Sequence, residues 1–180
     1  MKALIQRVSS SQVKVDGKVA GSIENGLLVF VGLEKQDTKL IADKMINKII
    51  TYRVFPDENQ KMNLSLNDIQ GELLIISQFT LAADTKNGTR AGFSTAMPPS
   101  EAENLYDYLV NKAKSSNLKI QTGIFGADMK VSILNDGPVT FLLEIFSPVF
   151  LVLLNLLTIE KIQYLEICLR NSSSLLGLIC

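Results

Sequence analysis

The chain has 180 residues, and its 18 Lys and Arg are balanced by 18 Asp and Glu, so the formal net charge is zero. This balance argues against a broadly basic protein that binds nucleic acid mainly by charge, and leaves room only for a small contact that reads shape. The absence of histidine and the presence of only two cysteines exclude a Ser-His-Asp or Cys-His catalytic group, a His-ligated metal and a four-cysteine zinc site within one chain.

Short strands separated by turns are predicted for the N-terminal part. The first residues alternate between polar and apolar and lack the apolar run of a signal peptide, so we expect a cytoplasmic protein. Asp16-Gly17 and Asn25-Gly26 are turn signals, because tight hairpin turns need positive φ at their central positions. The predicted strands cover residues 3–8, 12–15, 18–23 and 27–33.

A helix is predicted next, with Asp37 as its N-cap. Its apolar residues fall largely on one helical face; they are Leu40, Ile41, Met45, Ile46, Ile49 and Ile50. A short strand at residues 52–55 and an apolar strand at residues 72–78 follow. A long polar loop then covers residues 82–96, and a loop of this length in a small domain is usually functional or mobile.

A second helix is predicted after the two prolines at residues 98 and 99. Ser100 and Glu103 have the spacing of a capping box. Strands at residues 119–122, 129–134 and 139–145 complete the body. About eight strands and two helices without regular βαβ alternation indicate an α+β domain, with a mainly antiparallel, barrel-like β-sheet and two flanking helices.

Two polar stretches are candidate sites. The first, Ser77-Gln78-Phe79-Thr80, ends a buried apolar strand, where a site could be held rigidly beside a loop. The second, Asn135-Asp136-Gly137-Pro138, lies between two apolar strands. Each also has a simple structural interpretation: a strand that reaches the surface, and an ordinary hairpin turn.

The chemistry open to these stretches is limited. Ser77 and Thr80 have no histidine to deprotonate them and no nearby Ser-x-x-Lys. We see no acidic metal cluster and expect neither a metal nor a cofactor. If the chain is an enzyme, catalysis must depend on backbone donors, an oxyanion-type pocket or a group of the substrate.

Taken together, the two stretches resemble the D-aminoacyl-tRNA deacylases of the bacterial and eukaryotic type. The resemblance extends over residues 1–145. Besides the two stretches, it is carried by Ile5-Gln6-Arg7-Val8, Gly26-Leu27-Leu28-Val29, Tyr52-Arg53-Val54-Phe55, Lys61-Met62-Asn63-Leu64, Leu105-Tyr106-Asp107-Tyr108, Gln121-Thr122-Gly123 and Ala127-Asp128-Met129.

The resemblance implies a hydrolase that cleaves the ester between a D-amino acid and the 3′-terminal adenosine of tRNA, and clears glycine from some mischarged tRNAs. It implies a homodimer with two sites at the subunit interface and the acceptor end of aminoacyl-tRNA as partner. Gly137-Pro138 would match the family's Gly-cis-Pro motif, which enters the partner's pocket and leaves no room for an L side chain. Arg7 would match the arginine that braces this motif.

The resemblance also implies roles around the pocket. Ser77, Gln78, Phe79 and Thr80 match the segment that lines it, where main-chain N–H groups would stabilise an oxyanion. In a chain without histidine, the 2′-OH of the tRNA would assist the reaction, and Thr80 as nucleophile is the alternative. Phe125 and Met129 match positions near the pocket and the terminal adenine, although both could equally be core residues.

Residues 146–180 depart from the family pattern. They hold both cysteines and only two Lys or Arg and two Asp or Glu, so we divide the chain at 145/146. Three interpretations stay open: an extension that packs as a helix at residues 155–169, a membrane- or partner-binding segment, and a non-native continuation. We expect no membrane span, because the apolar stretch at residues 146–159 is shorter than the ~20 residues that a span needs.

Two competing functions also stay open. One is a non-catalytic, dimeric binding module on the same scaffold, whose pocket or interface is obstructed by residues 146–180. The other is a generic Ser/Thr esterase, against which the missing base argues. Dimer mass and turnover separate these from a deacylase.

Overall fold

One long strand, β1 (Lys2–Val15), organises the sheet in this computed structural model, which describes residues 1–146. It pairs antiparallel with β2 (Lys18–Ile23), β3 (Gly26–Gly32) and β8 (Lys130–Glu144). The prediction of two short strands here is wrong, because pairing with β8 continues past Ser10 and Ser11. Residues Met1–Ile145 form one compact unit. The helix expected at residues 155–169 and the other interpretations of the C-terminal part fall on residues 147–180, outside the described residues.

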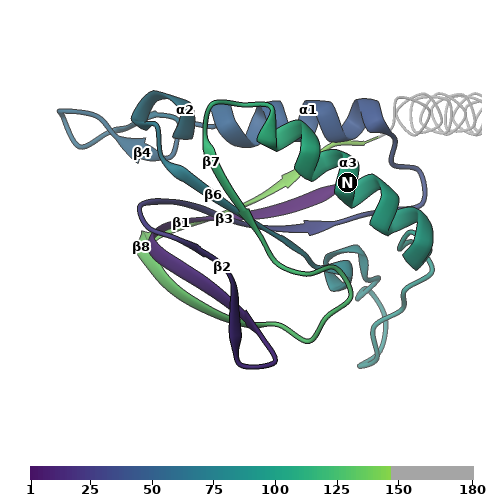
Figure 1. The fold of residues 1–180 in the computed structure, drawn as a ribbon. Coiled ribbons are helices and arrows are strands. Elements are labelled where there is room, and N and C mark those ends of the chain that lie inside the picture. The colour runs from purple at the N-terminus through teal and green to yellow at the C-terminus, as the bar shows by residue number, and fades with distance from the viewer. Residues whose placement is uncertain (147–180) are drawn as a thin grey trace, which may run out of the picture. The chain divides into compact units, whose positions relative to one another are not determined.

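Two further strands extend the sheet in parallel orientation. β6 (Glu72–Ser77) pairs with β3, and β7 (Lys119–Thr122) pairs with β6. The order is β2-β1-β3-β6-β7, with β8 on β1, and the sheet curls until β2 approaches β7 (Figure 1). A Cβ on Gly21 of β2 would lie 2.7 Å from the Thr122 carbonyl oxygen. The α+β class and the barrel-like sheet are confirmed, and the sheet is mixed, with three antiparallel pairs and two parallel ones.

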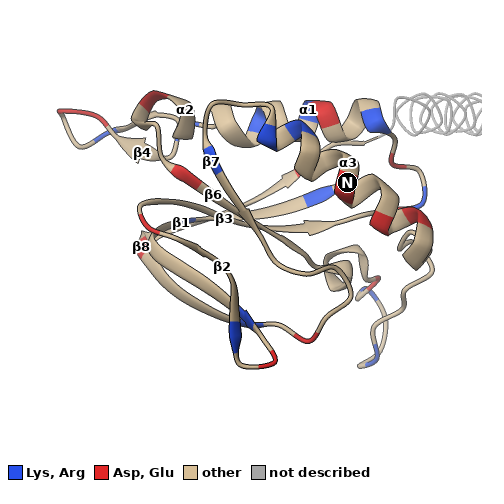
Figure 2. Ribbon diagram, in the orientation of Figure 1, with Lys and Arg blue, Asp and Glu red and all other residues tan. Residues whose placement is uncertain are grey.

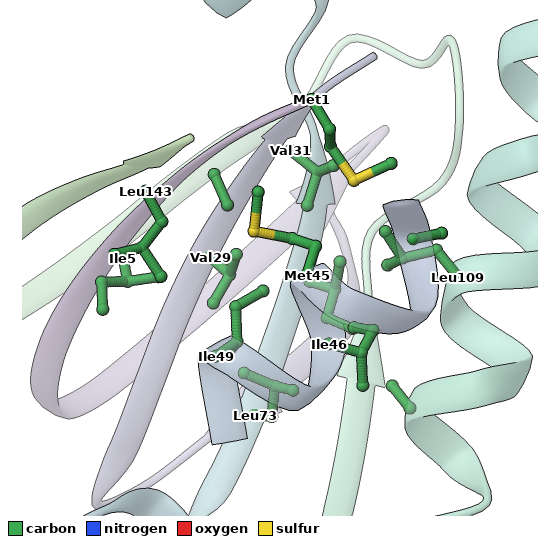
Figure 3. Close-up of a cluster of buried hydrophobic side chains, with 14 of the residues drawn as sticks. Met1, Ile5, Val29, Val31, Met45, Ile46, Ile49, Leu73, Leu109 and Leu143 are labelled. Carbon is green, nitrogen blue, oxygen red and sulfur yellow. The ribbon is translucent and has the colours of Figure 1, made fainter. Parts of the chain in front are cut away.

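Two long helices cover one side of the sheet (Figure 1). They are α1 (Lys39–Thr51) and α3 (Pro99–Lys114). Buried side chains of α1 pack against the sheet strands and Leu109 of α3 (Figure 3). Leu40 is 58% exposed and does not belong to this buried face, because it lies about 100° around the helix from Ile41.

The helix starts differ from the predicted ones. Thr38 is the N-cap of α1 and accepts from the Ile41 N–H, whereas the Asp37 carboxylate accepts from the Met1 ammonium at 2.6 Å and the Glu34 N–H at 2.7 Å. The predicted capping box at Ser100 is also wrong, since α3 already begins at Pro99.

A short helix, α2 (Leu66–Ile69), was not predicted. It carries the capping box that forms in this structure, between Ser65 and Asp68. It follows a two-stranded sheet of β4 (Phe55–Pro56) and β5 (Met62–Leu64). Of the strand predicted at residues 52–55, only Phe55 is part of a strand in the structure.

Among the described residues, no helix is long and apolar enough to cross a membrane.

β8 is one strand with an irregularity, so the predicted hairpin turn between two strands is wrong. Gln6 of β1 pairs with Thr140, and Val8 pairs with Asn135. The four residues from 136 to 139 therefore stand opposite the single residue Arg7 and form a bulge at the edge of the sheet.

Candidate functional site

The carboxyl ends of two parallel strands, β3 and β6, create the first candidate site. The centre of β6 is wholly buried because it lies between two strands and beneath the helices. Its end, Ser77, pairs with Val31 of β3, and the Gln78 N–H donates to the Val31 carbonyl at 2.7 Å. Ligands bind preferentially beyond the carboxyl ends of parallel strands, where the chain is held but no longer covered.

After β6 the chain forms a single 3₁₀ turn, η1 (Phe79–Ala82). This turn packs directly on β3, where a Cβ on Gly32 would lie 2.7 Å from the Leu81 Cβ. The Gln78 amide donates to the Thr80 hydroxyl at 2.5 Å. Because the first N–H groups of a helix have no partner within it, η1 presents the main-chain donors of Phe79 and Thr80.

The long loop after η1 is tied to the sheet at its base. Asp84 and Gly92 exchange two backbone hydrogen bonds of 2.8 and 2.9 Å, and the Thr95 hydroxyl donates to the Ala82 carbonyl. The Met97 N–H donates to the Leu33 carbonyl at 3.0 Å. The loop therefore closes one side of the space beyond β3 and β6.

The connection between β7 and β8 closes another side. Its Phe125 ring lies 5.6 Å from the ring of Tyr106 on α3. The Tyr106 hydroxyl donates to the Ile75 carbonyl at 2.9 Å, which also accepts from the Gly123 N–H at 3.1 Å. Burial raises the pKa of Tyr106, with a smaller contribution from Asp107. The phenol therefore stays protonated and holds α3, β6 and this connection together.

These elements enclose a mainly apolar cavity of about 620 Å³, which is the size of a small-molecule site. Five predicted site residues line it: Ser77, Gln78, Phe79, Phe125 and Met129. The remaining lining residues are Val31, Leu33, Ile76, Phe93, Ala96, Met97, Pro98, Pro99, Ala102, Gly126, Ala127, Asp128 and Val131. Thr80 is exposed and is not among the lining residues.

The other predicted residues form a second group at the bulge of β8. Arg7 donates from Nε to the Asp136 carbonyl at 3.1 Å and from Nη1 to the Val54 carbonyl at 2.7 Å, and its Nε also pairs with the Asp136 carboxylate at 3.0 Å. The Asn135 side chain accepts from the Val139 N–H at 2.9 Å. Gly137 and Pro138 thus project from a braced backbone, and the peptide bond between them is cis.

Gly137 has a φ of +125°, which L side chains rarely adopt. A Cβ there would lie 2.7 Å from a Val139 methyl group and 2.9 Å from Nη2 of Arg7. Glycine is therefore required at this position by both conformation and space.

One chain does not bring the two groups together. Arg7 pairs with Leu27 of β3, whereas the cavity begins at Val31. Four residues of strand correspond to about 13 Å. Neither Arg7, Gly137 nor Pro138 lines the cavity, so within one chain the bulge and the cavity are separate features.

The comparison with protein families identifies the family to which this chain belongs. The family model for D-Tyr-tRNA(Tyr) deacylase matches residues 4–144. The chain belongs to the D-aminoacyl-tRNA deacylase family. The match contains both the cavity and the bulge, and the resemblance inferred from the sequence is confirmed.

Relatives of the deacylase family agree over the same region. A D-aminoacyl-tRNA deacylase of Pseudoalteromonas translucida is 57% identical over 145 residues, which are 81% of this chain and 100% of that protein. One of Cellvibrio japonicus is 52% identical over 144 residues, which are 80% of this chain and 99% of that protein. Proteins of this name are hydrolases, so the prediction of an enzyme is confirmed.

Solved structures share the deacylase fold. The c-Myc DNA unwinding element binding protein has a TM-score of 0.78 and 39% identity, and covers 82% of this chain and 100% of its own. A probable eukaryotic D-amino acid tRNA deacylase has a TM-score of 0.70 and 14% identity, and covers 80% of this chain and 98% of its own. At that identity the second likeness concerns the fold alone.

Several residues that line the cavity were not predicted. Phe93 comes from the long loop, Met97 directly follows this loop, and Ala102 comes from the first turns of α3. The length of the loop and the two prolines were the available signals. Neither could show that this loop and α3 meet the end of β6, because that depends on long-range packing.

Proposed function

We propose that this chain hydrolyses the ester between a D-amino acid and the 3′-terminal adenosine of tRNA. The observation that carries the proposal is the cavity at the end of β6, within a region that matches the deacylase family almost end to end. Its apolar walls suit the base and the side chain of the ester, and the polar strand end at Ser77 and Gln78 suits the reacting carbonyl.

The proposed reaction adds water to the ester carbonyl and breaks the bond to the ribose oxygen, which leaves with a proton. The main-chain N–H groups of Phe79 and Thr80 would stabilise the oxyanion. The 2′-OH of the terminal ribose would assist the proton transfer, since the sequence contains no histidine. Thr80 is disfavoured as a nucleophile because it is exposed outside the cavity lining.

Chirality would be read by a second subunit. We propose a homodimer in which Gly137 and Pro138 of one protomer enter the cavity of its partner, hold the substrate amino group with their carbonyls and exclude an L side chain. The separation of bulge and cavity within one chain supports this arrangement. The bracing by Arg7 supports a fixed backbone, which such exclusion needs.

The edge of β8 supports the same proposal. Among the described strands only β1 pairs with β8, so a 15-residue strand has one open edge. Ile133, Leu134 and Leu142 are 41%, 60% and 52% exposed around the bulge. An open edge with exposed apolar side chains is typical of a strand that meets another chain.

In the cell, this activity would be a proofreading step of translation in the cytoplasm, with the tRNA acceptor end as the bound partner. Removal of glycine from mischarged tRNA would follow from the same exclusion rule, because glycine has no side chain to clash. The absence of a side chain to hold would make glycine a weaker ligand than a D-amino acid with a large apolar side chain.

The test is the release of D-tyrosine and L-tyrosine from matched charged tRNAs, followed together with the mass of the native protein. Rapid loss of only the D-ester from a dimer is the expected result. Loss of both esters would show that the Gly137-Pro138 bulge does not select chirality. Loss of neither, from a folded dimer, would favour a binding module without catalysis.

We also propose that residues 1–145 are the deacylase domain and that residues 146–180 are dispensable. The family match ends at residue 144, and the relative from Pseudoalteromonas translucida is matched over its whole length. A chain that ends at residue 145 should keep its dimer mass and turnover. Loss of soluble dimer in that chain would contradict this assignment.

A further inference from the structure

We propose that the loop of residues 84–92 binds the phosphate backbone of the RNA strand that leads into the cavity. The inference rests on the proposed function and identifies the part of the chain that holds the RNA behind its terminal adenosine. The occupant is a nucleic-acid strand, and the recognition is of charge and shape rather than of sequence.

Two cations stand on this loop, Lys86 and Arg90 (Figure 2). Both are exposed, and within the described part of the chain neither makes an ion pair. The one carboxylate of the loop, Asp84, accepts from the main-chain N–H of Lys86 at 3.0 Å. The loop therefore presents two unpaired positive charges to solvent.

The loop is anchored beside the cavity. The bridge between Asp84 and Gly92 closes its base, and the next residue, Phe93, lines the cavity. The Phe93 ring lies 5.1 Å from the ring of Phe79. Arg90 is three residues from Phe93, so its Cα lies within about 11 Å of the cavity wall.

Two exposed aromatic rings connect the cavity to the cations. Phe79 is 62% exposed and Phe93 is 43% exposed, although both line the cavity. Exposed aromatic rings give unpaired bases a surface to stack on, whatever the base. A strand whose last nucleotide enters the cavity could pass these rings and then reach Lys86 and Arg90.

Charge elsewhere at the cavity favours this direction. The first turn of α3, which forms another part of the wall, carries Glu101. Asp128 lines the cavity and is paired with Lys130 at 2.9 Å. The Glu101 carboxylate makes no ion pair among the described residues, and such a carboxylate repels phosphates. The 84–92 loop is therefore a better exit for the strand than the side formed by α3.

The test compares Lys86→Ala/Arg90→Ala with the parent chain on D-tyrosyl-tRNA and on D-tyrosyl-adenosine, which has no phosphate. On D-tyrosyl-tRNA we expect KM to rise and kcat to change little, because the reacting groups lie inside the cavity. On D-tyrosyl-adenosine, KM should stay within about twofold of the parent value.

The size of the effect follows from counterion release. The slope of log K against log salt is about −0.7 to −0.9 per phosphate contact. Relative to 1 M salt, each contact then strengthens binding about fourfold to fivefold at 0.15 M salt. Loss of two contacts should therefore raise KM by roughly 15- to 30-fold. The slope itself should become less steep by about 1.4–1.8 in the double variant.

The matched control is Lys44→Ala/Lys114→Ala, which removes two exposed cations of α1 and α3 that make no ion pair with any residue from 1 to 146. An unchanged KM and salt slope in Lys86→Ala/Arg90→Ala would overturn the inference. Equal effects in both double variants would also overturn it, because they would show a general charge effect. If the parent chain releases no D-tyrosine from either substrate, the proposed function itself fails, and that result differs from the other two.

Discussion

The hydroxyl of Tyr106 offers a sharp test of how the cavity is held together. Tyr106→Phe removes one buried hydrogen bond and keeps the ring that packs on Phe125. The Ile75 carbonyl keeps a second partner, the Gly123 N–H at 3.1 Å. The acceptor is therefore not left unsatisfied, and only the net value of one hydrogen bond is lost.

That net value is about 0.5–1.5 kcal/mol in the free energy of unfolding near pH 7. For a chain of this size, a loss of about 1 kcal/mol lowers Tm by roughly 2–4 °C. An unsatisfied carbonyl would instead raise the cost to as much as about 3 kcal/mol.

The same variant should behave differently at alkaline pH. Because burial raises the pKa of Tyr106 in the folded chain, the unfolded chain releases this proton first. The folded state then binds more protons, so the parent chain loses stability as pH rises above about 10, by up to ~1.4 kcal/mol per pH unit. Phenylalanine has no such proton, so the two proteins should become equally stable between about pH 10 and 11.

Urea unfolding at pH 7 and across pH 9.5–11 measures both effects. Tyr52→Phe is the matched control, because the Tyr52 ring is also packed, edge-on to Phe141, and its hydroxyl makes no hydrogen bond among the described residues. It should change stability by less than about 0.5 kcal/mol. A Tyr106→Phe protein as stable as the parent at pH 7, or a gap that widens above pH 10, would refute the reasoning.

Four other changes have expected outcomes. Ser65→Ala removes the N-cap of α2 and should lower the free energy of unfolding by about 1 kcal/mol at constant m. Hydrogen bonds from Ser65 lower the pKa of Asp68. The Asp68 carboxylate therefore stabilises the fold at pH values above its ordinary pKa, and this stabilisation is lost as pH falls. Asp68→Asn should accordingly make the free energy of unfolding depend less on pH on the acid side. Thr80→Ala should keep turnover within about fivefold, and a loss above about 100-fold in a folded dimer would restore the nucleophile hypothesis. Gly137→Ala should lower turnover at least about tenfold with circular dichroism unchanged, because a Cβ there would lie 2.7 Å from a Val139 methyl group; full D-selective activity would contradict the role of the bulge.

Local signals in the sequence were sufficient for part of the site. The apolar run of β6 followed by Ser77 and Gln78 predicted a buried strand with a polar end, and the structure places both residues at the cavity. The spacing of Ile41, Met45 and Ile49 predicted the buried face of α1 in the same way. These features depend on neighbours in the chain, which a pattern can show.

Long-range pairing and competition between caps explain the failures. β1 continues through Ser10 and Ser11 because β8 pairs with both residues, over more than 120 residues of sequence. Asp37 was a reasonable N-cap, but the Met1 ammonium takes its carboxylate and leaves the cap to Thr38. The sequence of one strand or helix does not show which distant segments it pairs with in the fold.

The pairing of the first strand with the last has a consequence for synthesis. The Met1 ammonium donates to the Ile145 carbonyl, 144 positions away, and β1 pairs with β8 along most of its length. At about 5–20 residues per second, a ribosome needs roughly 7–30 s to make residues 1–145. During that time β1 has only β2 and β3 as partners, and its other edge stays open to any strand nearby. The open β1 edges of two chains translated close together on one messenger could therefore pair with each other. Fast folding after release would protect the protein from this mispairing more than high equilibrium stability would.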